Sequence, residues 1–256
     1  MKKNAKYAAP ALDKGLDILE YLAESGVPAS QSEIANALGR SPTEIFRMLA
    51  RLEDRGYIYR HPVSAKYQLS LKLFQLSRTH SPIEALRRTA LRPMQELAEQ
   101  TGHPAHMSVL DRDAIVVVTQ VRGPNPVVLS IQEGARFPVE TTTSGRLLLA
   151  CMPEASRDDI LAKSKIFQSW SPRRRTAYLK ELEKIRENGH HIARSAITDG
   201  VIDIAALIGQ RDGALLASLA ISCVSSTLGR KSSPESLLEA AVSTANQINR
   251  INGFNT

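Results

Sequence analysis

The chain has 256 residues, a length that suits one or two domains and slightly favours two. Its hydrophobic fraction of 43% and charged fraction of 23% are those of an ordinary soluble globular protein, which excludes wholesale disorder, a collagen-like fibre and a disulfide-stapled miniprotein. The formal net charge of +7 suggests a polyanionic partner, such as nucleic acid or a membrane surface.

The excess positive charge lies mainly near the N-terminus. Residues 1–80 carry 12 basic and 8 acidic side chains, and five arginines fall between Arg40 and Arg60, although a solvated helix face could also account for such a run. No apolar segment follows the basic start, and the longest apolar stretch (147–152) is too short to span a bilayer. The two cysteines make neither a disulfide framework nor a metal spacing. We therefore expect a cytoplasmic protein with reduced thiols and no metal, cofactor or membrane partner.

Three helices are predicted at the start of the chain. Leucines at helical spacing place the first helix over residues 10–25. Two capping boxes of the form Ser-x-x-Glu, at residues 30–33 and 41–44, begin two further helices, and glycines end them. The second and third helices are joined by residues 39–41, which is the spacing of a helix-turn-helix.

The third helix is expected to present a chemically mixed surface. Its apolar stripe runs through Ile45, Leu49 and Leu52. Hydroxyl, carboxylate, aromatic and guanidinium groups remain on the other side, and these groups can contact base edges and phosphates. A bland solvated helix face is the alternative interpretation. The residues that this pattern turns outward are Pro42, Thr43, Glu44, Phe46, Arg47, Ala50 and Arg51.

A β-hairpin is predicted directly after the third helix. Residues 57–60 and 66–69 alternate as strands around a short turn. A hairpin in this place is a wing, and Arg60, His61 and Lys66 at its tip suit phosphate contact.

The stretch at residues 31–39, QSEIANALG, and the motifs RML, GYI and YQLS that follow it resemble the IclR family of bacterial transcriptional regulators. That family usually has a threonine three residues before the recognition-helix arginine, here Arg47, whereas this chain has Glu44. The carboxylate can accept a hydrogen bond from cytosine N4 or can close the capping box, and both interpretations stay open. The residues expected to contact DNA are Ser32, Ser41, Thr43, Glu44, Phe46, Arg47, Arg51, Arg60 and Lys66.

The rest of the chain mixes strand and helix patterns. A helix is expected from residue 82 to about 100, with Pro93 restarting or kinking it, and Leu71–Ser77 forms a linker helix. Strands grouped on either side of helices favour an α+β domain with a largely antiparallel sheet. Strands are expected at 106–110, 115–121, 127–131, 201–208 and 214–221, and further helices at 144–151, 156–164, 173–188 and 234–251.

The resemblance to the IclR family extends to residue 251 and implies a GAF-like effector-binding domain over 81–256. The expected division is a winged helix-turn-helix domain over 1–70, a linker helix over 71–80 and this second domain. In the family, segments matching residues 134–150 and 200–222 form a pocket for a small organic effector. The residues carried over to that pocket are Leu129, Phe137 and Val201 as an apolar wall, Thr143 and Ser144 as hydroxyl donors, and Asp203, Ala220 and Ser222 at the polar floor.

The pocket region departs from the family at Asp203, where relatives have a cysteine, and at Ala220, where they have a serine. Relatives that sense small carboxylates hold them through neutral donors, and an ionised Asp203 would repel a carboxylate. We therefore hypothesise a hydroxylated, amine-bearing or otherwise neutral ligand. An outward-pointing Asp203, or one paired with Arg194, is the alternative.

Catalytic motifs are weak in this sequence. His103 and His106 have a ligand-like spacing, but Pro104 blocks a helix, so a strand entry is expected there. Ser144 lacks the Gly-x-Ser-x-Gly elbow, phosphate-binding glycine motifs are absent, and Cys151 is expected in the core.

We therefore predict a ligand-responsive transcriptional regulator of a catabolic operon, with repression favoured, and not an enzyme. It is expected to bind double-stranded, pseudo-palindromic operator DNA as a homodimer or a dimer of dimers. The alternative is a metabolite-binding module or small-molecule enzyme with a vestigial winged domain.

Overall fold

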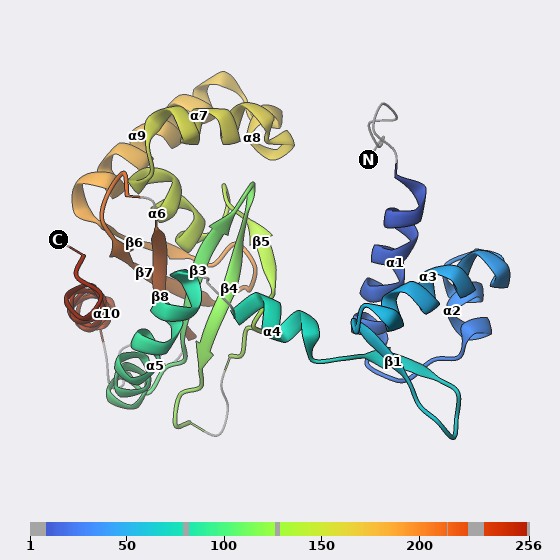
Figure 1. Ribbon diagram of the computed structural model, residues 1–256. Helices are drawn as coiled ribbons and strands as arrows, with labels where there is room; N and C mark the ends of the chain where they lie inside the picture. The colour runs from blue at the N-terminus through green and yellow to red at the C-terminus, as the bar shows by residue number, and fades with distance from the viewer. Residues whose placement is uncertain (1–8, 79–81, 126–128, 214, 225–232, 255–256) are drawn as a thin grey trace. The chain divides into compact units, whose positions relative to one another are not determined.

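The computed structural model describes residues 9–78, 82–125, 129–213, 215–224 and 233–254. The chain divides into two compact units, Met1–Ser81 and Pro82–Thr256, and each is described by itself (Figure 1). Within the described residues, none of the helices combines the length and the hydropathy that a membrane span requires.

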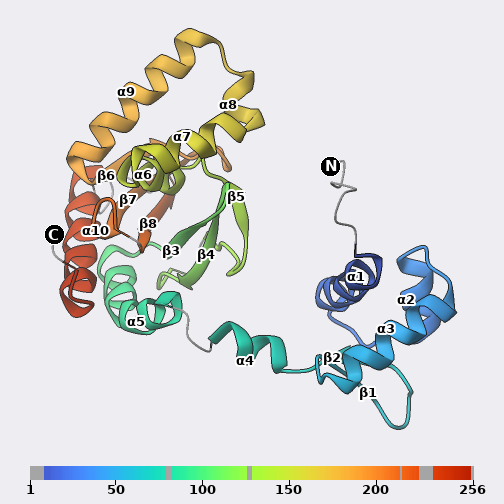
Figure 2. The ribbon, with the colours of Figure 1, turned by 45° about the horizontal axis from the view of Figure 1, so that its top comes forward.

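The first unit is a three-helix bundle followed by a hairpin and a short helix (Figure 2). Both predicted capping boxes are confirmed, because the side chains of Ser30 and Ser41 each accept the backbone N–H three residues later while the glutamate there returns to the cap. The hairpin strands pair antiparallel, which confirms the wing. Its elements are α1 (Pro10–Ser25), α2 (Gln31–Ala37), α3 (Pro42–Asp54), β1 (Ile58–Arg60), β2 (Tyr67–Leu69) and α4 (Lys72–Arg78).

One apolar core holds this unit together. Ile18 of α1, Ile34 of α2, and Ile45 and Leu49 of α3 are all fully buried in it. The wing is tied to the same core, because Tyr67 of β2 is buried in it and its backbone exchanges hydrogen bonds with Ala29. The apolar face of α3 is therefore fixed inward, and its opposite face is left to solvent.

The second unit is built on a six-stranded antiparallel sheet in the order β5-β4-β3-β8-β7-β6, which confirms the predicted α+β class. The strands are β3 (Ala105–Asp111), β4 (Ala114–Val121), β5 (Arg136–Pro138), β6 (His190–Arg194), β7 (Val201–Gly209) and β8 (Leu216–Val224). The helices are α5 (Pro82–Thr101), α6 (Thr143–Cys151), α7 (Glu154–Lys163), α8 (Lys165–Ser169), α9 (Pro172–Asn188) and α10 (Pro234–Ile251).

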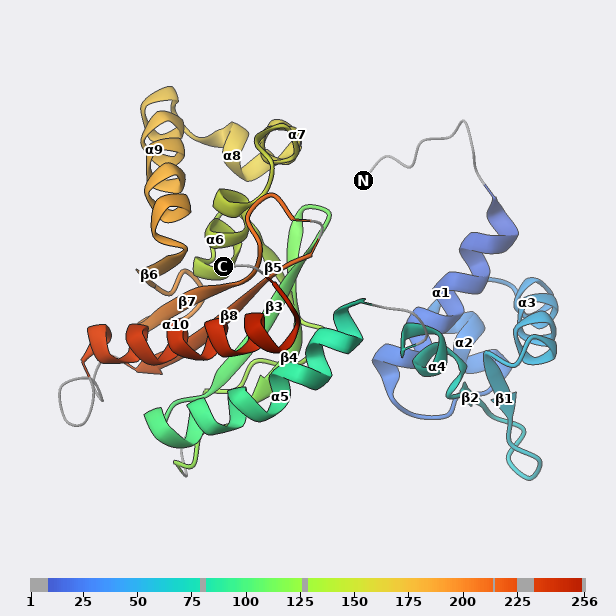
Figure 3. The same cartoon turned by 60° about the vertical axis from the view of Figure 1, so that its left-hand side comes forward.

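The two faces of the sheet carry separate cores because side chains alternate along each strand. On β7, Ile204 and Ala206 pack with α5 and α10, whereas Ala205 packs with α6 and α9. Figure 3 shows α5 and α10 running side by side along one face. The helix α6 lies on the other face, and its first residues line the pocket described below.

Several sequence predictions for the second unit are wrong in detail. The strand expected at 127–131 is irregular over the described residues 129–131, whereas residues 127 and 128 lie outside the described part of the chain. Pairing with β4 falls instead to the three-residue β5, which was not predicted. The edge strand β6 and the short helix α8 were also missed. Pro93, which was expected to restart or kink the helix, lies buried inside the single helix α5.

Candidate nucleic-acid interface and ligand pocket

The outer face of α3 carries the side chains that sequence reasoning assigned to DNA. Thr43, Phe46, Arg47 and Ala50 are exposed, and Phe46 leaves 53% of its surface to solvent. Among the described residues Arg47 makes neither an ion pair nor a hydrogen bond through its guanidinium, which leaves its donors available. An exposed phenyl ring beside a free guanidinium gives this helix both an apolar and a charged contact for a duplex.

Glu44 has a local structural role at the start of α3. Its carboxylate accepts hydrogen bonds from the Ser41 hydroxyl at 3.0 Å and from the Ser41 backbone N–H at 3.2 Å, and Lys14 Nζ donates to it at 2.6 Å. The Lys14 contact, followed by those from Ser41, lowers the pKa of Glu44 to about 2. Of the two interpretations left open by the sequence, the capping box is therefore present in the unbound chain.

Other predicted DNA-contacting side chains already have partners within the first unit. Arg51 donates to Asp54 on the exposed end of α3. Lys66 pairs with Glu33 at 3.2 Å, and Arg60 donates to the Ala65 carbonyl at 3.2 Å while its guanidinium lies over the Tyr67 ring. These contacts hold the three side chains in place. Arg51, Arg60 and Lys66 each keep further N–H donors that can bind a phosphate.

A hollow joins the start of α2 to the wing. It is lined by the hydroxyl side chains at the beginning of α2, by the first residue of α3 and by one side of the hairpin. The structure thus brings together Ser32 and Arg60, which are far apart in the sequence. The lining residues are Ser30, Gln31, Ser32, Pro42, Arg60, Ser64, Ala65 and Tyr67.

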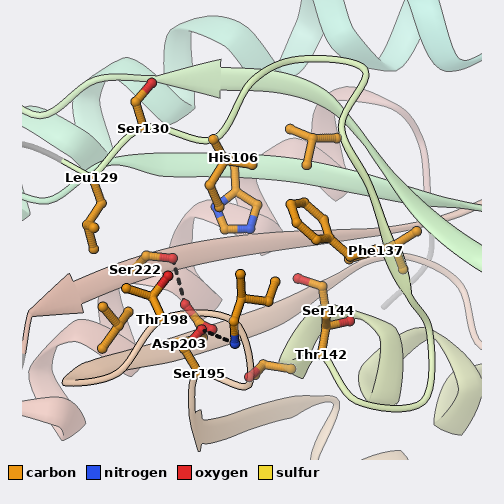
Figure 4. A pocket seen from close by; sticks show the side chains of 16 residues that line it. His106, Leu129, Ser130, Phe137, Thr142, Ser144, Ser195, Thr198, Asp203 and Ser222 are labelled. Atoms are coloured by element: carbon orange, nitrogen blue, oxygen red, sulfur yellow. Dashed lines mark hydrogen bonds between the residues drawn. The ribbon is translucent and has the colours of Figure 1, made fainter. Parts of the chain in front are cut away.

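The second unit contains a small pocket of about 100 Å³ between the sheet and the start of α6 (Figure 4). Seven of the eight side chains that sequence reasoning assigned to it line this cavity. Ala220 does not: it is 1% exposed, stands opposite His106 in the sheet and packs in the core beneath α6. The lining residues are His106, Ile115, Val117, Leu129, Ser130, Ile131, Phe137, Thr142, Thr143, Ser144, Ser195, Ile197, Thr198, Val201, Asp203 and Ser222.

Asp203 faces the cavity. It stands opposite Ser222 in the β7–β8 pairing, and the Ser222 hydroxyl donates to its Oδ1 at 2.6 Å. The expected alternatives, an outward carboxylate or one paired with Arg194, are therefore not what the structure shows. Figure 4 shows Asp203 and Ser222 on one side of the pocket, with Ser195 and Thr198 beside them.

His106 is the pocket residue that sequence reasoning missed. The position was expected to be a strand entry, and β3 does begin at Ala105, but the His106 ring is turned into the cavity and is only 8% exposed. Burial lowers the pKa of His106, with the nearby Asp203 carboxylate acting in the opposite direction. In the pairing of β3 with β8, His106 stands opposite Ala220, so both side chains lie on the same face of the sheet. The sequence periodicity of β3 alone does not reveal this pairing.

The start of α6 closes one end of the pocket. Thr142 caps the helix by accepting the Gly145 N–H at 3.1 Å, and Thr143 and Ser144 are each 4% exposed. Gly145 is required there, because a Cβ would overlap the Val139 carbonyl and lie 2.7 Å from Thr142 Oγ1. The close approach of Gly145 to the Val139 carbonyl gives a structural reason for glycine after Thr143 and Ser144.

Neither a metal-binding cluster nor a reactive Cys151 is found in the part of the chain that the structure describes. Among the described residues no group of three or more histidine, cysteine or acidic side chains could hold a metal ion. Cys151 is fully buried, as expected, and burial raises its pKa to about 11, so its thiol remains protonated.

A winged helix-turn-helix unit joined to an α+β unit with a small-ligand pocket defines a one-component transcriptional regulator. Residues 11–62 match the family described as "IclR helix-turn-helix domain", and residues 83–250 match "Bacterial transcriptional regulator IclR C-terminal". The chain therefore belongs to the IclR family of bacterial transcriptional regulators, whose members are regulators and not enzymes.

Known proteins with similar sequences and structures agree with this assignment. The HTH-type transcriptional regulator XynR of Escherichia coli (strain K12) is 25% identical over 84% of this chain and 86% of its own length. The HTH-type transcriptional repressor AllR of the same organism is 25% identical over 88% of this chain and 83% of its own. The fold matches, with a TM-score of 0.75 and 19% identity, an IclR homolog from Microbacterium hydrocarbonoxydans crystallised with 4-hydroxybenzoate, over 94% of this chain and 98% of the other.

Proposed function

We propose that this regulator represses a catabolic operon by binding a pseudo-palindromic operator through α3 and the wing, and that a small effector in the second unit controls this binding. The observation that carries the proposal is the outer face of α3, where Phe46 is 53% exposed and the Arg47 guanidinium has no partner among the described residues. An isolated exposed phenylalanine on a solvated helix gains nothing from its position, whereas thymine methyl groups and sugars give it a partner.

Repression and effector binding are supported by the relatives. AllR is a repressor, and the homolog from Microbacterium hydrocarbonoxydans binds 4-hydroxybenzoate, a small organic molecule. The pocket in this chain, at about 100 Å³, is smaller than the roughly 300–1,000 Å³ of drug-sized ligand sites and so admits only a small organic molecule. A two-fold operator requires two recognition helices, so we further propose a homodimer or a dimer of dimers.

The proposal is tested by measuring operator affinity of the full-length chain at fixed salt. The DNA is the promoter region beside the protein's own gene, and the variant is Arg47→Ala. If Arg47 reads a guanine, its loss weakens specific binding by about 1–3 kcal/mol. The matched control is Arg92→Ala, which removes the same charge from an 87% exposed side chain on α5, outside the DNA-binding unit.

Three outcomes separate the alternatives. Weakened binding by Arg47→Ala but not by Arg92→Ala supports the proposal. Unchanged binding by both variants removes Arg47 from the interface. Failure of the wild-type chain to bind any duplex above its nonspecific affinity favours the metabolite-binding module with a vestigial winged domain.

A further inference from the structure

The described lining of the pocket contains an acidic side chain but no lysine or arginine. Among the described residues that line it, Asp203 is an acid, His106 is an imidazole, and the other polar side chains are hydroxyls. A ligand entering the cavity therefore meets a carboxylate with no cation to neutralise it.

The Asp203 carboxylate is placed to accept a further hydrogen bond. Its Oδ1 receives the Ser222 hydroxyl at 2.6 Å, and this one neutral donor leaves the remaining acceptor capacity of the group facing the cavity. Ser195 and Thr198 lie next to it in Figure 4 and add hydroxyl oxygens, of which Ser195 Oγ already accepts the Ile197 N–H at 3.4 Å. The floor of the pocket thus gathers hydrogen-bonding oxygens around Asp203.

His106 does not supply the missing positive charge. It is 8% exposed, and burial lowers its pKa and favours the neutral ring, against the opposing effect of the Asp203 carboxylate. A neutral imidazole offers one donor and one acceptor, which suits a second polar atom of a ligand held at Asp203. The strands that carry the two side chains, β3 and β7, lie on either side of β8, so His106 and Asp203 approach the cavity from separate strands.

Two features of the described lining favour an anion: the hydroxyl groups, which can donate to it, and the N-terminus of α6. The helix N-terminus contributes a partial charge of roughly half a unit, and Thr142 already occupies one of its N–H groups at Gly145. The Asp203 carboxylate lines the same small cavity, so an anionic ligand would lie beside it. Repulsion between like charges at that position disfavours a carboxylate.

Resting on the proposed function as an effector-controlled regulator, we propose that the pocket takes a small ligand whose hydroxyl or ammonium group donates a hydrogen bond to Asp203, and that Asp203 excludes carboxylates. His106 is the second specificity-determining residue. The apolar remainder of the ligand lies against Leu129, Phe137 and Val201. Since an apolar cavity of roughly 150 Å³ holds benzene, a cavity of about 100 Å³ suits a short branched chain better than a ring.

The test compares probes that share a skeleton and differ only in the polar group. Benzyl alcohol, benzylamine and benzoate form one series, and isobutanol, isobutylamine and isobutyrate form a smaller one. Binding to the full-length protein is measured by calorimetry and by the shift in unfolding temperature. We expect an alcohol or an amine in at least one series to bind the wild-type chain, and the carboxylate of that series to bind at least about tenfold more weakly, because hydrogen bonds to charged groups are the stronger ones.

The variant Asp203→Asn keeps the size of the side chain and removes its charge. It is expected to weaken the amine at least about tenfold and to bring the carboxylate closer to the amine, since the repulsion is gone. The matched control, Asp199→Asn, makes the same charge change at an exposed position outside the lining and should leave every probe unaffected. Should Asp203→Asn fail to fold, the wild-type series decides the matter without it.

Two results overturn the proposal. One is a carboxylate that binds the wild-type chain as tightly as its matched alcohol and amine, and the other is the absence of binding by every alcohol and amine in both series. Operator binding by the ligand-free protein is measured in the same samples. If the protein binds the operator but none of the alcohols and amines, only the ligand assignment is wrong. If it does not bind DNA, the proposed function is contradicted, and the measured ligand preference still holds.

Discussion

At the residue scale, Glu44 links the stability of the recognition helix to pH. Its pKa is lowered from 4.5 to about 2 by Lys14 and Ser41, so the carboxylate is more acidic in the folded chain than in the unfolded one. This stabilisation is complete above pH 4.5 and is lost as the pH falls toward 2. Glu44→Gln keeps the capping geometry, because glutamine also serves at this position, and removes the ion pair.

Thermal unfolding followed between pH 6 and pH 3 checks this prediction. The Glu44→Gln variant should unfold at a lower temperature than the wild-type chain at pH 6, and the difference should shrink as the pH falls. Glu53→Gln, at an exposed position of the same helix, is the matched control and should track the wild-type curve. A difference that stays constant with pH would show that the Lys14 pair contributes nothing.

Single residues differ in how far the sequence could predict them. The capping boxes and the outward face of α3 followed from spacing alone, because local hydrogen bonds and helical periodicity decide them. Asp203 could be assigned to the pocket only through the family resemblance. His106 could not be assigned, because its place depends on the register between β3 and β8, which is a long-range pairing with no local signal.

At the scale of elements, the start of α6 depends on a glycine. A methyl group at Gly145 would overlap the Val139 carbonyl and crowd the Thr142 hydroxyl that caps the helix. Gly145→Ala is therefore expected to reduce the free energy of unfolding by about 1–3 kcal/mol, as overpacking does. A lowered unfolding temperature of the full-length chain, together with weaker binding of whichever probe fits the pocket, is the expected result.

Gly15→Ala is the control for this substitution. Gly15 lies within α1, where an added Cβ meets no atom within 4 Å, so alanine should stabilise the chain by up to about 1 kcal/mol through its higher helix propensity. If both glycine variants changed stability in the same direction, the close approach at Gly145 would not be the cause.

The elements that the sequence failed to predict share a physical cause. The strand β5 has three residues and β6 is an edge strand with a mixed exposure pattern, so neither shows a clear period of two. The apolar residues around 127–131 mimic a strand, but over the described residues 129–131 they line the pocket without pairing. Long elements were predicted almost to their ends: α10 has one buried face, and β7 is a largely apolar run that packs on both faces of the sheet.

At the scale of the whole molecule, the structure shows which unit carries most of the net positive charge. The larger share of the excess, +4 of the +7, lies in residues 1–80, which carry α3 and the wing. The described lining of the pocket in the second unit includes Asp203 and neither lysine nor arginine. Charge alone could not separate nucleic acid from a membrane surface as the partner. The family separates them, because residues 11–62 match a helix-turn-helix domain and α3 lies within that range.

Self-association is the last expected property. The first unit exposes leucines on α1, with Leu12 at 62% and Leu16 at 45%, and in or beside α4, with Leu71 at 73% and Leu76 at 52%. Burying one such side chain contributes about 1.5–3 kcal/mol. We predict that these leucines pack against a second copy of the chain and so pair the two recognition helices that a two-fold operator needs.

The double variant Leu12→Glu with Leu76→Glu should therefore weaken association by at least about a hundredfold, since two buried leucines together contribute more than 2.8 kcal/mol. Sedimentation should show a smaller average mass, and the operator titration should move to higher protein concentration. Ile251→Glu, which changes a 52% exposed residue at the end of α10, is the matched control and should leave both unchanged. An unaltered mass with weakened operator binding would place these leucines against DNA, and an unaltered result in both measurements would assign association to the effector unit alone.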